Sequence, residues 1–251
     1  MTTVKDFFLP SNSVSGIPDD EYQKTEILIR TFDAISRTTS QSLYVIDYFR
    51  QNFLYVSGNP MFLCGYTATE VKEMGYMFYL KNVPEEEQNM LTEINRAGFD
   101  FFNKISVDER INYMISYNFH LLNGKKKTLI NHKLTPVMLT PTGRVWLAAC
   151  VVSLSSHNTP GHIEMRKSNQ ATFWKYSLES RRWKENQGVA LNEREKDILL
   201  LSAQGYTMDE IAERLFLSID TVKFQKKRIF EKLEVKNIAE ALSFAANHKL
   251  L

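Results

Sequence analysis

The sequence predicts an α+β protein in which an antiparallel sheet with helices is followed by a small β connector and a four-helix bundle. Short apolar runs rich in β-branched and aromatic residues alternate with turn signals between residues 41 and 156, which is typical of antiparallel strands. Residues 60–104, inside this region, have helical character. After residue 188, four capping signals open four short helices with tight connections.

The length and composition of the chain allow two small domains, and the sequence contains no segment apolar enough to span a membrane. The chain has 251 residues, of which 43% are hydrophobic, and a net charge of +2. A membrane-spanning helix needs about 20 apolar residues, whereas the longest unbroken apolar run is 145–152. The N-terminus lacks the pattern of a secretory signal, and Cys64 and Cys150 form no C-x-x-C pair. We therefore expect a cytoplasmic protein without a disulfide framework.

Residues 1–40 are expected to form a loose lead followed by one amphipathic helix. The apolar positions of this helix recur at three- to four-residue spacing, at Ile27, Leu28, Phe32 and Ile35. Two interpretations remain open, because the apolar side can pack on the next domain or pair with its copy in a dimer.

Residues 41–156 carry the sheet. Strand patterns cover residues 43–47, 53–58, 111–122, 129–139 and 145–155. Asn123-Gly124 is a two-residue hairpin signal, because both residue types tolerate positive φ. A helical stretch separates the first two strands from the last three. We expect one sheet from these strands, with helices on one face that bury its alternating apolar side chains.

Residues 157–188 do not obviously continue this sheet. A turn cluster covers residues 157–161, and strand-like runs follow at 162–166 and 173–178. These runs predict a small β-rich connector that ends at Asn186-Gln187-Gly188.

Residues 189–251 carry the four helices. Capping boxes are predicted where Asn192, Thr207 and Asn237 each precede a glutamate by three positions. Ser218 caps the third helix, residues 219–233. Residues 207–233 thus form a helix, a tight turn and a second helix.

The third helix has one apolar face and one basic face. On a helical wheel, Ile229 and Leu233 fall within about 20° of Val222 and form the core face. Lys226 lies at the edge of this face. Three cations and one aromatic ring lie about 100° to 240° from Val222: Lys223, Phe224, Lys227 and Arg228.

This basic face predicts double-stranded DNA as a partner. An α-helix fits the major groove, where exposed side chains meet base edges and phosphates. A solvated helix face normally mixes charge signs, yet residues 223–228 contain four cations and no acid. The alternative is a solvated charged face without a binding role.

Residues 191–241 resemble the LuxR-type helix-turn-helix family of transcription regulators. The family pattern is matched without a gap at Leu191, Arg194, Glu195, Leu199, Ala203, Gly205, Thr207, Glu210, Ile211, Ala212, Leu215, Ser218, Thr221, Val222, Lys223, Ile229, Lys232, Leu233, Val235, Asn237, Glu240 and Ala241. Two departures are Gln225 in place of the usual His and Ile238 in place of the usual Arg.

The resemblance implies a set of base-contacting residues on the third helix, and the wheel selects the same face. We expect Lys223, Phe224 and Lys227 to contact bases, and Thr221, Gln225, Lys226 and Arg228 to contact phosphates. Gln225 retains a donor for a phosphate oxygen, whereas Ile238 puts any polar contact at its position in doubt.

Residues 41–156 resemble the PAS sensory-domain family, in strand order and in the segment 58–70. That segment is similar to the family stretch N-x-x-F-x-x-x-x-G-Y-[ST]-x-x-E, and residues 82–86 resemble its H-P-x-D hinge with the His and Asp changed. The resemblance implies a domain that gates or dimerises the DNA-binding module. No haem ligand is nominated and Cys64 lacks the context of a flavin adduct, so no cofactor is predicted. The resemblance also allows a small-molecule ligand in this domain, whose identity the sequence does not indicate.

No pattern of catalysis or metal binding emerges, and we expect no enzyme. The five histidines (residues 120, 132, 157, 162 and 248) show no metal-ligand spacing, and neither a phosphate-binding loop nor G-x-S-x-G occurs. Asp47 lacks the acidic pair of a phosphoacceptor receiver domain. Two classes remain: a sensory transcription regulator that acts with the transcription machinery, and an interaction module that contacts protein instead of DNA.

A homodimer is expected, because one recognition helix reads only a few base pairs. Two surfaces are candidates for the dimer contact. Ala241 and Ala245 are small residues one turn apart that permit close helix approach, unless they pack inside a single bundle. The amphipathic helix near the N-terminus is the other candidate.

Overall fold

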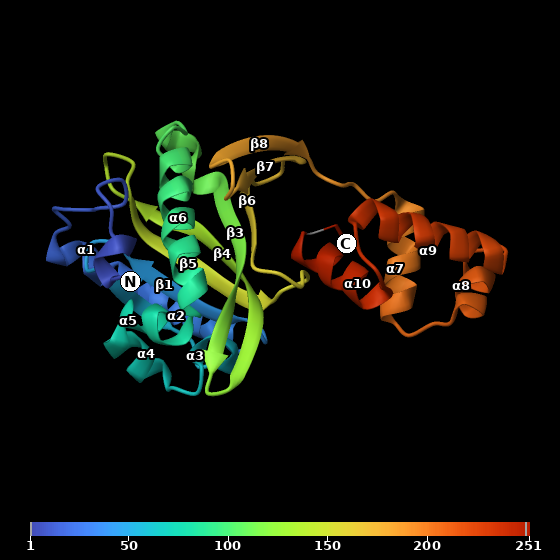
Figure 1. The fold of residues 1–251 in the computed structure, drawn as a ribbon, viewed down its shortest axis with the longest axis horizontal. Helices are drawn as coiled ribbons and strands as arrows, with labels where there is room; N and C mark the ends of the chain where they lie inside the picture. Colours follow the sequence, from blue (N-terminus) through green and yellow to red (C-terminus); the bar gives the residue numbers. More distant parts are fainter. Residues whose placement is uncertain (1, 249) are drawn as a thin grey trace. The chain divides into compact units, whose positions relative to one another are not determined.

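The chain folds into two compact units, Met1–Asn186 and Gln187–Leu251 (Figure 1). The computed structural model describes residues 2–248 and 250–251. The second unit begins close to residue 189, where we expect the last domain to start. Within the described residues, no helix combines the length and apolar character needed to cross a membrane.

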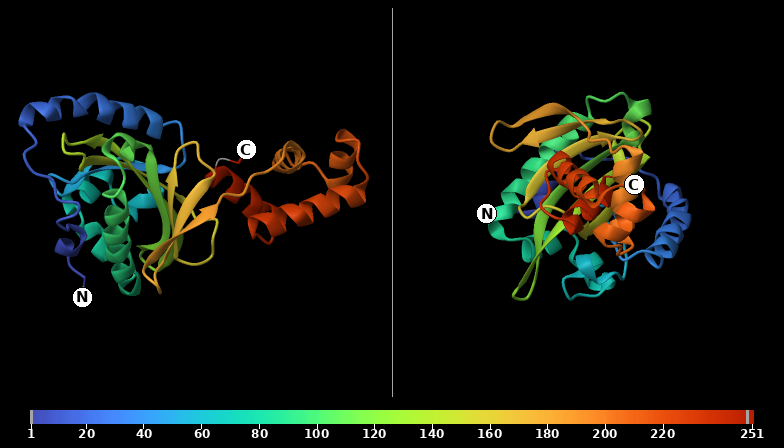
Figure 2. Two further views of the ribbon diagram at one scale, coloured as in Figure 1. Left: turned by 90° about the horizontal axis from the view of Figure 1, so that it is seen from above. Right: turned by 90° about the vertical axis from the view of Figure 1, so that its right-hand side faces the viewer.

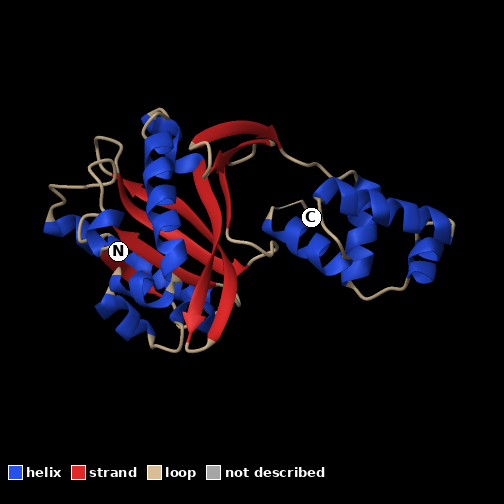
Figure 3. Cartoon of the chain, in the orientation of Figure 1, coloured by secondary structure: helices blue, strands red, loops and turns tan. Residues whose placement is uncertain are grey.

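One antiparallel sheet of eight strands forms the frame of the first unit, in the order β2-β1-β5-β4-β3-β6-β7-β8 (Figure 3). The strands are β1 Ser42–Asp47, β2 Asn52–Val56, β3 Tyr113–Asn123, β4 Lys126–Leu139, β5 Val145–Leu154, β6 Gly161–Lys167, β7 Thr172–Ser177 and β8 Arg182–Gln187. The first five are the strands that the sequence predicts. The β3–β4 hairpin turns at Asn123-Gly124, with Gly124 at φ 57°.

The segment predicted as a β-rich connector forms strands β6, β7 and β8, but these strands extend the same sheet. β6 pairs with β3, where Met165 lies opposite Ile115, and β7 pairs with β6. Two strands separate β3 from β6 in the sequence. Pairing between strands that are not consecutive leaves no local turn signal, so the sequence gives no indication of this edge.

Helices cover one face of the sheet, as expected. They are α3 Pro60–Leu63, α4 Ala68–Met74, α5 Met77–Asn82 and α6 Glu85–Phe102. α6 crosses this inner face in front of the central strands (Figure 1). A short 3₁₀ helix, η2 Val107–Asn112, joins α6 to β3.

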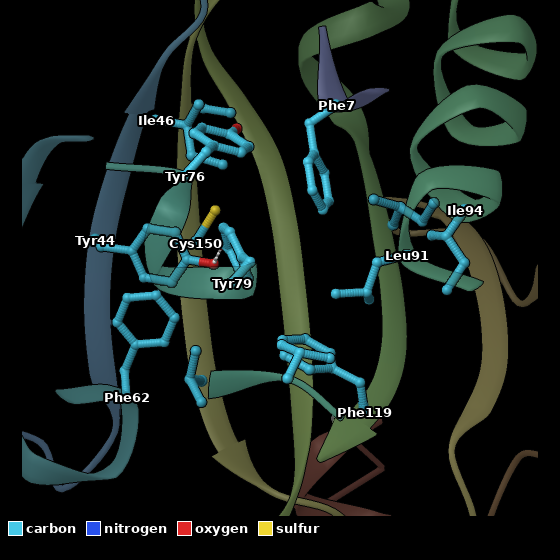
Figure 4. Close-up of a cluster of buried hydrophobic side chains, with 14 of the residues drawn as sticks. Phe7, Tyr44, Ile46, Phe62, Tyr76, Tyr79, Leu91, Ile94, Phe119 and Cys150 are labelled. Carbon is cyan, nitrogen blue, oxygen red and sulfur yellow. Dashed lines mark hydrogen bonds between the residues drawn. The ribbon is translucent and has the colours of Figure 1, made fainter. Parts of the chain in front are cut away.

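An aromatic core fills the space between these helices and the sheet (Figure 4). Tyr44 on β1 stacks on Phe62, with ring centroids 4.2 Å apart, and its hydroxyl is 2.6 Å from that of Tyr79. The same hydroxyl lies 2.5 Å from Nε2 of His132. Complete burial lowers the pKa of His132 to about 3, so the ring is neutral at ordinary pH.

The outer face of the sheet is covered over β1 and β2 by α2 Thr25–Ser36, which follows α1 Asp19–Gln23. Leu28 and Phe32 pack against a cluster that includes Leu43 and Trp146. The apolar side of this helix therefore packs on its own domain. Ile27 lies away from that cluster and is 69% exposed.

The N-terminal lead is not loose, contrary to the prediction. It forms η1 Val4–Phe7, and Phe7 is buried with its ring 5.5 Å from that of Tyr76. The Phe7 carbonyl accepts hydrogen bonds from the side-chain amides of Asn12 (2.8 Å) and Asn95 (2.7 Å). The N-terminal segment is thus held on the domain by one buried ring and by the side-chain amides of Asn12 and Asn95. Such contacts leave no repeating apolar pattern in the sequence.

The second unit is the expected four-helix bundle, made of α7 Glu193–Ala203, α8 Met208–Arg214, α9 Ile219–Leu233 and α10 Ile238–Asn247. Capping boxes begin α7 at Asn192 and α8 at Thr207, and Ser218 caps α9. The third predicted box differs, because the Glu240 carboxylate accepts from the backbone of Lys236 instead of Asn237.

Of the two alternatives for Ala241 and Ala245, the structure favours packing inside a single bundle. Both residues have no exposed area and belong to the core of the bundle. Their small side chains let α10 approach α7 and α9 closely, which explains their spacing without a second copy.

We predict that Phe7→Ala lowers the free energy of unfolding of the first unit by about 3–5 kcal/mol, because a buried ring leaves a cavity among its aromatic neighbours. Urea titration followed by circular dichroism measures the change. Lys5→Ala in the same short helix is exposed and should alter stability by less than about 0.5 kcal/mol. Equal, small effects for both variants would contradict this packing role.

Candidate nucleic-acid interface

The recognition-helix candidate α9 is held by one face and open on the other. Val222 and Ile229 have no exposed area, and Leu233 is 2% exposed within the core of the bundle. The opposite side carries the exposed side chains of Lys223, Phe224, Lys227 and Arg228. The exposed face is the one that the helical wheel selects.

Two cations on this face have acidic neighbours on the same helix. Lys223 Nζ lies 3.6 Å from Asp220, and Lys227 Nζ lies 3.8 Å from Glu231. All four side chains are more than half exposed. Such surface pairs contribute about 0–1 kcal/mol, so both ammonium groups can exchange a carboxylate for another anion at little cost.

Phe224 is the aromatic centre of the exposed face, with 58% of its area exposed. The guanidinium carbon of Arg228 lies 5.8 Å from the centre of the Phe224 ring. This distance is within the range of a cation–π contact. The contact holds an apolar ring beside a charge that points to solvent.

The three remaining predicted residues lie at the edges of the exposed face, where they are partly buried: Thr221, Gln225 and Lys226. The Thr221 hydroxyl is 2.8 Å from the hydroxyl of the capping residue Ser218, at the N-terminus of α9. Partial burial lowers the pKa of Lys226. The aliphatic stem of Lys226 therefore lies on the protein, as its position on the wheel predicts.

The turn between α8 and α9 contains a residue that the sequence analysis missed. Phe216 adopts φ 55°, in the left-handed region, and is 95% exposed. The Leu217 amide donates to the Ala212 carbonyl at 2.8 Å, which fixes the turn. A phenylalanine gives no sequence signal for positive φ, which favours glycine or asparagine.

An ion pair anchors α9 to α7. Lys232 Nζ lies 2.7 Å from the carboxylate of Glu195, whose side chain is 3% exposed and also accepts from the Asn192 amide at 2.9 Å. Burial by itself raises the pKa of Glu195, but the Lys232 ammonium and the Asn192 amide outweigh it and lower that pKa. The charged Glu195 carboxylate thus helps to fix the rotation of α9 about its own axis relative to α7.

Other candidate groups have structural roles. Asp47 accepts hydrogen bonds from the amides of Phe49 and Arg50 and from the Tyr22 hydroxyl, so it closes the β1–β2 turn. Cys64 and Cys150 are buried free thiols. Among the described residues, no group of three or more His, Cys, Asp or Glu side chains is arranged to hold a metal ion.

The first unit contains an apolar cavity of about 40 Å³ between α6 and the inner face of the sheet. Gly98 and Phe99 line it from α6, and Tyr117 and Leu134 line it from β3 and β4. For comparison, an apolar cavity of about 150 Å³ binds benzene. A ring-sized ligand therefore requires these side chains to move.

We predict that Phe216→Gly raises the free energy of unfolding of the second unit by about 1 kcal/mol, because glycine removes the cost of a left-handed conformation. Phe216→Ala is the matched control, since it removes the exposed ring but keeps the strained backbone. Thermal unfolding of both variants measures the difference. Equal stabilisation by alanine would show that the ring, and not the backbone, carries the cost.

We predict that Lys232→Met destabilises the second unit by about 1–3 kcal/mol at pH 7, because it leaves the buried Glu195 carboxylate without a partner. The pKa of Glu195 is lower in the folded protein than in the unfolded chain. The stabilisation by the Lys232–Glu195 ion pair is therefore complete above the unfolded pKa of about 4.3, and it is lost as the pH falls through the folded pKa of Glu195. Denaturant titrations between pH 7 and pH 3 should show the two proteins converging.

Lys196→Met is the control for the ion pair, because the Lys196–Glu193 pair at 2.8 Å lies at the surface, with Glu193 86% exposed. It should change stability by less than about 1 kcal/mol at any pH. A pH-independent loss in Lys232→Met would contradict the assigned role of the Glu195 charge.

Comparison with known proteins gives matches for both units. Residues 189–245 match the family model described as bacterial regulatory proteins, luxR family. The oxygen regulatory protein NreC of Staphylococcus carnosus is 46% identical over 61 residues, which are 24% of this chain and 28% of that protein. The response regulator protein VraR of Staphylococcus aureus is 44% identical over 61 residues, 24% of this chain and 29% of that protein. The chain thus spans less than a third of the length of these relatives.

Among solved structures, the phage VqmA–DPO complex has 16% identity and a TM-score of 0.36, and the alignment covers 92% of this chain and 91% of that chain. A PAS domain of a protein from Colwellia psychrerythraea has 14% identity and a TM-score of 0.35, over 55% of this chain and 98% of that chain. The family model matches residues within the second unit. Residues 189–245 form a helix-turn-helix domain of the luxR family of bacterial regulatory proteins.

Proposed function

We propose that this protein is a sequence-specific DNA-binding regulator of transcription that places α9 in the major groove. The observation that carries the proposal is the exposed face of α9, where Lys223, Lys227 and Arg228 surround one aromatic ring. The core contacts of Val222 and Ile229 force this face outward. A helix presented in this way can reach base edges and both phosphate rows.

The positions of the side chains suggest a division of roles. Lys223, Phe224 and Lys227 point outward from the middle of the helix and are proposed to contact bases, with the Phe224 ring against a thymine methyl group. The flanking residues Thr221, Gln225, Lys226 and Arg228 are proposed to contact phosphates.

The charge of the second unit supports a local interface. Residues 187–251 contain ten Lys and Arg and ten Asp and Glu, so the unit has no formal net charge. A neutral unit gains little from long-range attraction to DNA. Affinity must therefore come from the basic face of α9, and a small salt dependence is expected from the few phosphates that it neutralises.

Specific recognition by this unit is proposed to require two copies. Two α9 helices in successive major grooves need half-sites about 10 base pairs apart. The first unit would supply the dimer contact or gate the DNA-binding unit in response to a signal. Its cavity is the proposed place for a small-molecule input, subject to the side-chain movement described above.

We predict that Lys223→Ala and Lys227→Ala each weaken binding to the preferred site by about 1–3 kcal/mol and relax base preference there. Selection from a random DNA library gives the site, and fluorescence anisotropy gives the affinities. In contrast, Lys226→Ala and Arg228→Ala should weaken all sequences alike and lower the salt slope by about one unit for each lost phosphate contact.

Lys125→Ala is the control, because Lys125 is an exposed lysine at the β3–β4 turn in the other unit; it should leave DNA affinity unchanged. A sequence-selective loss in Arg228→Ala would reverse the proposed roles. If the wild-type protein selects no sequence and binds without salt dependence, the alternative of a protein-interaction module takes the place of this proposal.

A further inference from the structure

We propose that the outer face of β6, β7 and β8 binds the phosphate backbone of DNA beside the site read by α9, an inference that rests on the proposed function. These three strands form one end of the sheet, and Figure 2 shows β7 and β8 there, in orange. Their outer face carries a group of cations that few acids balance. Nothing in the local sequence pattern indicates this surface, because it depends on how the strands pair.

Aromatic contacts fix which side chains of β7 and β8 point away from α6. The ring centroids of Trp174 on β7 and Trp183 on β8 lie 5.3 Å and 5.0 Å from that of Phe101 on α6. Successive side chains of a strand point to opposite faces of the sheet. The exposed cations next to these two tryptophans therefore lie on the outer face: Lys175, Arg182 and Lys184.

β6 contributes a fourth cation to the same face. Arg166 is the cross-strand partner of Phe173 on β7, and its guanidinium carbon lies 4.0 Å from the centre of the Phe173 ring. The Lys175 ammonium lies 5.5 Å from the same ring centre. Both distances are in the range of cation–π contacts. Phe173 is only 6% exposed, so charged groups and not the ring form the surface.

One carboxylate lies among the outer-face side chains of these strands, and it already has a partner. Glu164 is 8% exposed, and its Oε2 lies 2.8 Å from the Arg166 guanidinium. Glu185 alternates with Lys184 and so points to the other side of β8. With four cations and one carboxylate, the outer face of β6–β8 has a formal charge of +3.

The other three cations have no acidic partner. Within the described part of the chain, no ion pair involves Lys175, Arg182 or Lys184. Like charges on neighbouring strands repel each other and destabilise the sheet locally. An anion on this face would remove that cost, and it could do so without breaking an existing pair.

The short connection to the second unit favours duplex DNA as this anion. β8 ends at Gln187 and α7 begins at Glu193, and six residue steps span at most about 20 Å. The end of β8 is therefore tethered close to any duplex that α9 occupies. Duplex DNA carries one negative charge per about 1.7 Å of its axis. Because tethering gives an effective concentration near the millimolar range, even a weak phosphate contact would form.

The contact is expected to be independent of base sequence. Exposed ammonium and guanidinium groups on a sheet face can reach the phosphates, which carry no sequence information directly. The buried Phe173 ring cannot stack on a base. The outer face of β6–β8 would thus supply general affinity for DNA, which the formally neutral second unit lacks.

Neutralisation of three cations in the full chain tests the proposal. Lys175→Gln/Arg182→Gln/Lys184→Gln removes three charges and keeps long polar side chains. The slope of log affinity against log salt should become shallower by about 0.9 for each lost phosphate contact. Between about 50 and 200 mM salt, the affinity advantage of the wild type should accordingly shrink about threefold for each lost contact.

A matched control removes the same charge elsewhere in the first unit. Lys72→Gln/Lys81→Gln/Lys125→Gln also replaces three exposed cations, and it should keep the salt slope of the wild type. Thermal unfolding should leave both triple variants close to the wild type, because all the substituted side chains are exposed.

The length of the DNA gives a second readout, which a merely structural effect of the substitutions would not move. A duplex extended by about 10 base pairs, one helical turn, on each side of the selected site should bind the wild type more tightly than the short duplex. The sequence of the extension should not matter. The variant of the outer face should bind both duplexes alike and keep the wild-type base preference, because α9 is unchanged.

The proposal is overturned if this variant and the wild type have the same salt slope and the same gain from the extended duplex. It is also overturned if the slopes agree and an oligoglutamate peptide binds the wild type but not the variant, because the face then serves an acidic polypeptide. In both cases the wild type still selects a DNA sequence. A wild type that selects none would instead overturn the proposed function, and the phosphate contact with it.

Discussion

Burial of Val222, Ile229 and Leu233 is the constraint on which the second unit depends. A helix that must place these residues in the core has one possible rotation about its axis, and that rotation presents the cations of residues 223–228 to solvent. The Lys232–Glu195 ion pair supports the same rotation from the far end of the helix. The interface therefore needs no mobile loop, because its side chains extend from an element already fixed by packing.

The sequence predicts this unit well because its information is local. Each helix start is marked by a side chain that caps its own amides, as Asn192 and Thr207 do, and the core face follows from a 3.6-residue period. The first five strands are predicted for the same reason, since alternation and the Asn123-Gly124 turn are local signals. The DNA-contacting roles of α9 stay predictions from its exposed face.

The features that sequence reasoning missed all depend on distant residues or on unfavourable conformations. The β3–β6 pairing joins strands that are separated in the sequence by β4 and β5, and Phe7 reaches the core from a segment with no repeating pattern. Ala241 and Ala245 suit a close approach either inside one bundle or between two copies, and only the packing of α7 and α9 decides between these. Phe216 adopts a backbone conformation that its residue type disfavours, so propensity argues against the observed turn.

If the second unit binds DNA as proposed, the acids beside the basic face limit its affinity for DNA of any sequence. Asp220 and Glu231 lie within 4 Å of Lys223 and Lys227, and the unit as a whole is formally neutral. A lysine that already has a carboxylate nearby gains less from an arbitrary phosphate, whereas a well-placed base edge offers directional hydrogen bonds that the carboxylate does not replace. In the proposed interface, this arrangement would reduce affinity for arbitrary sequences more than affinity for the correct site.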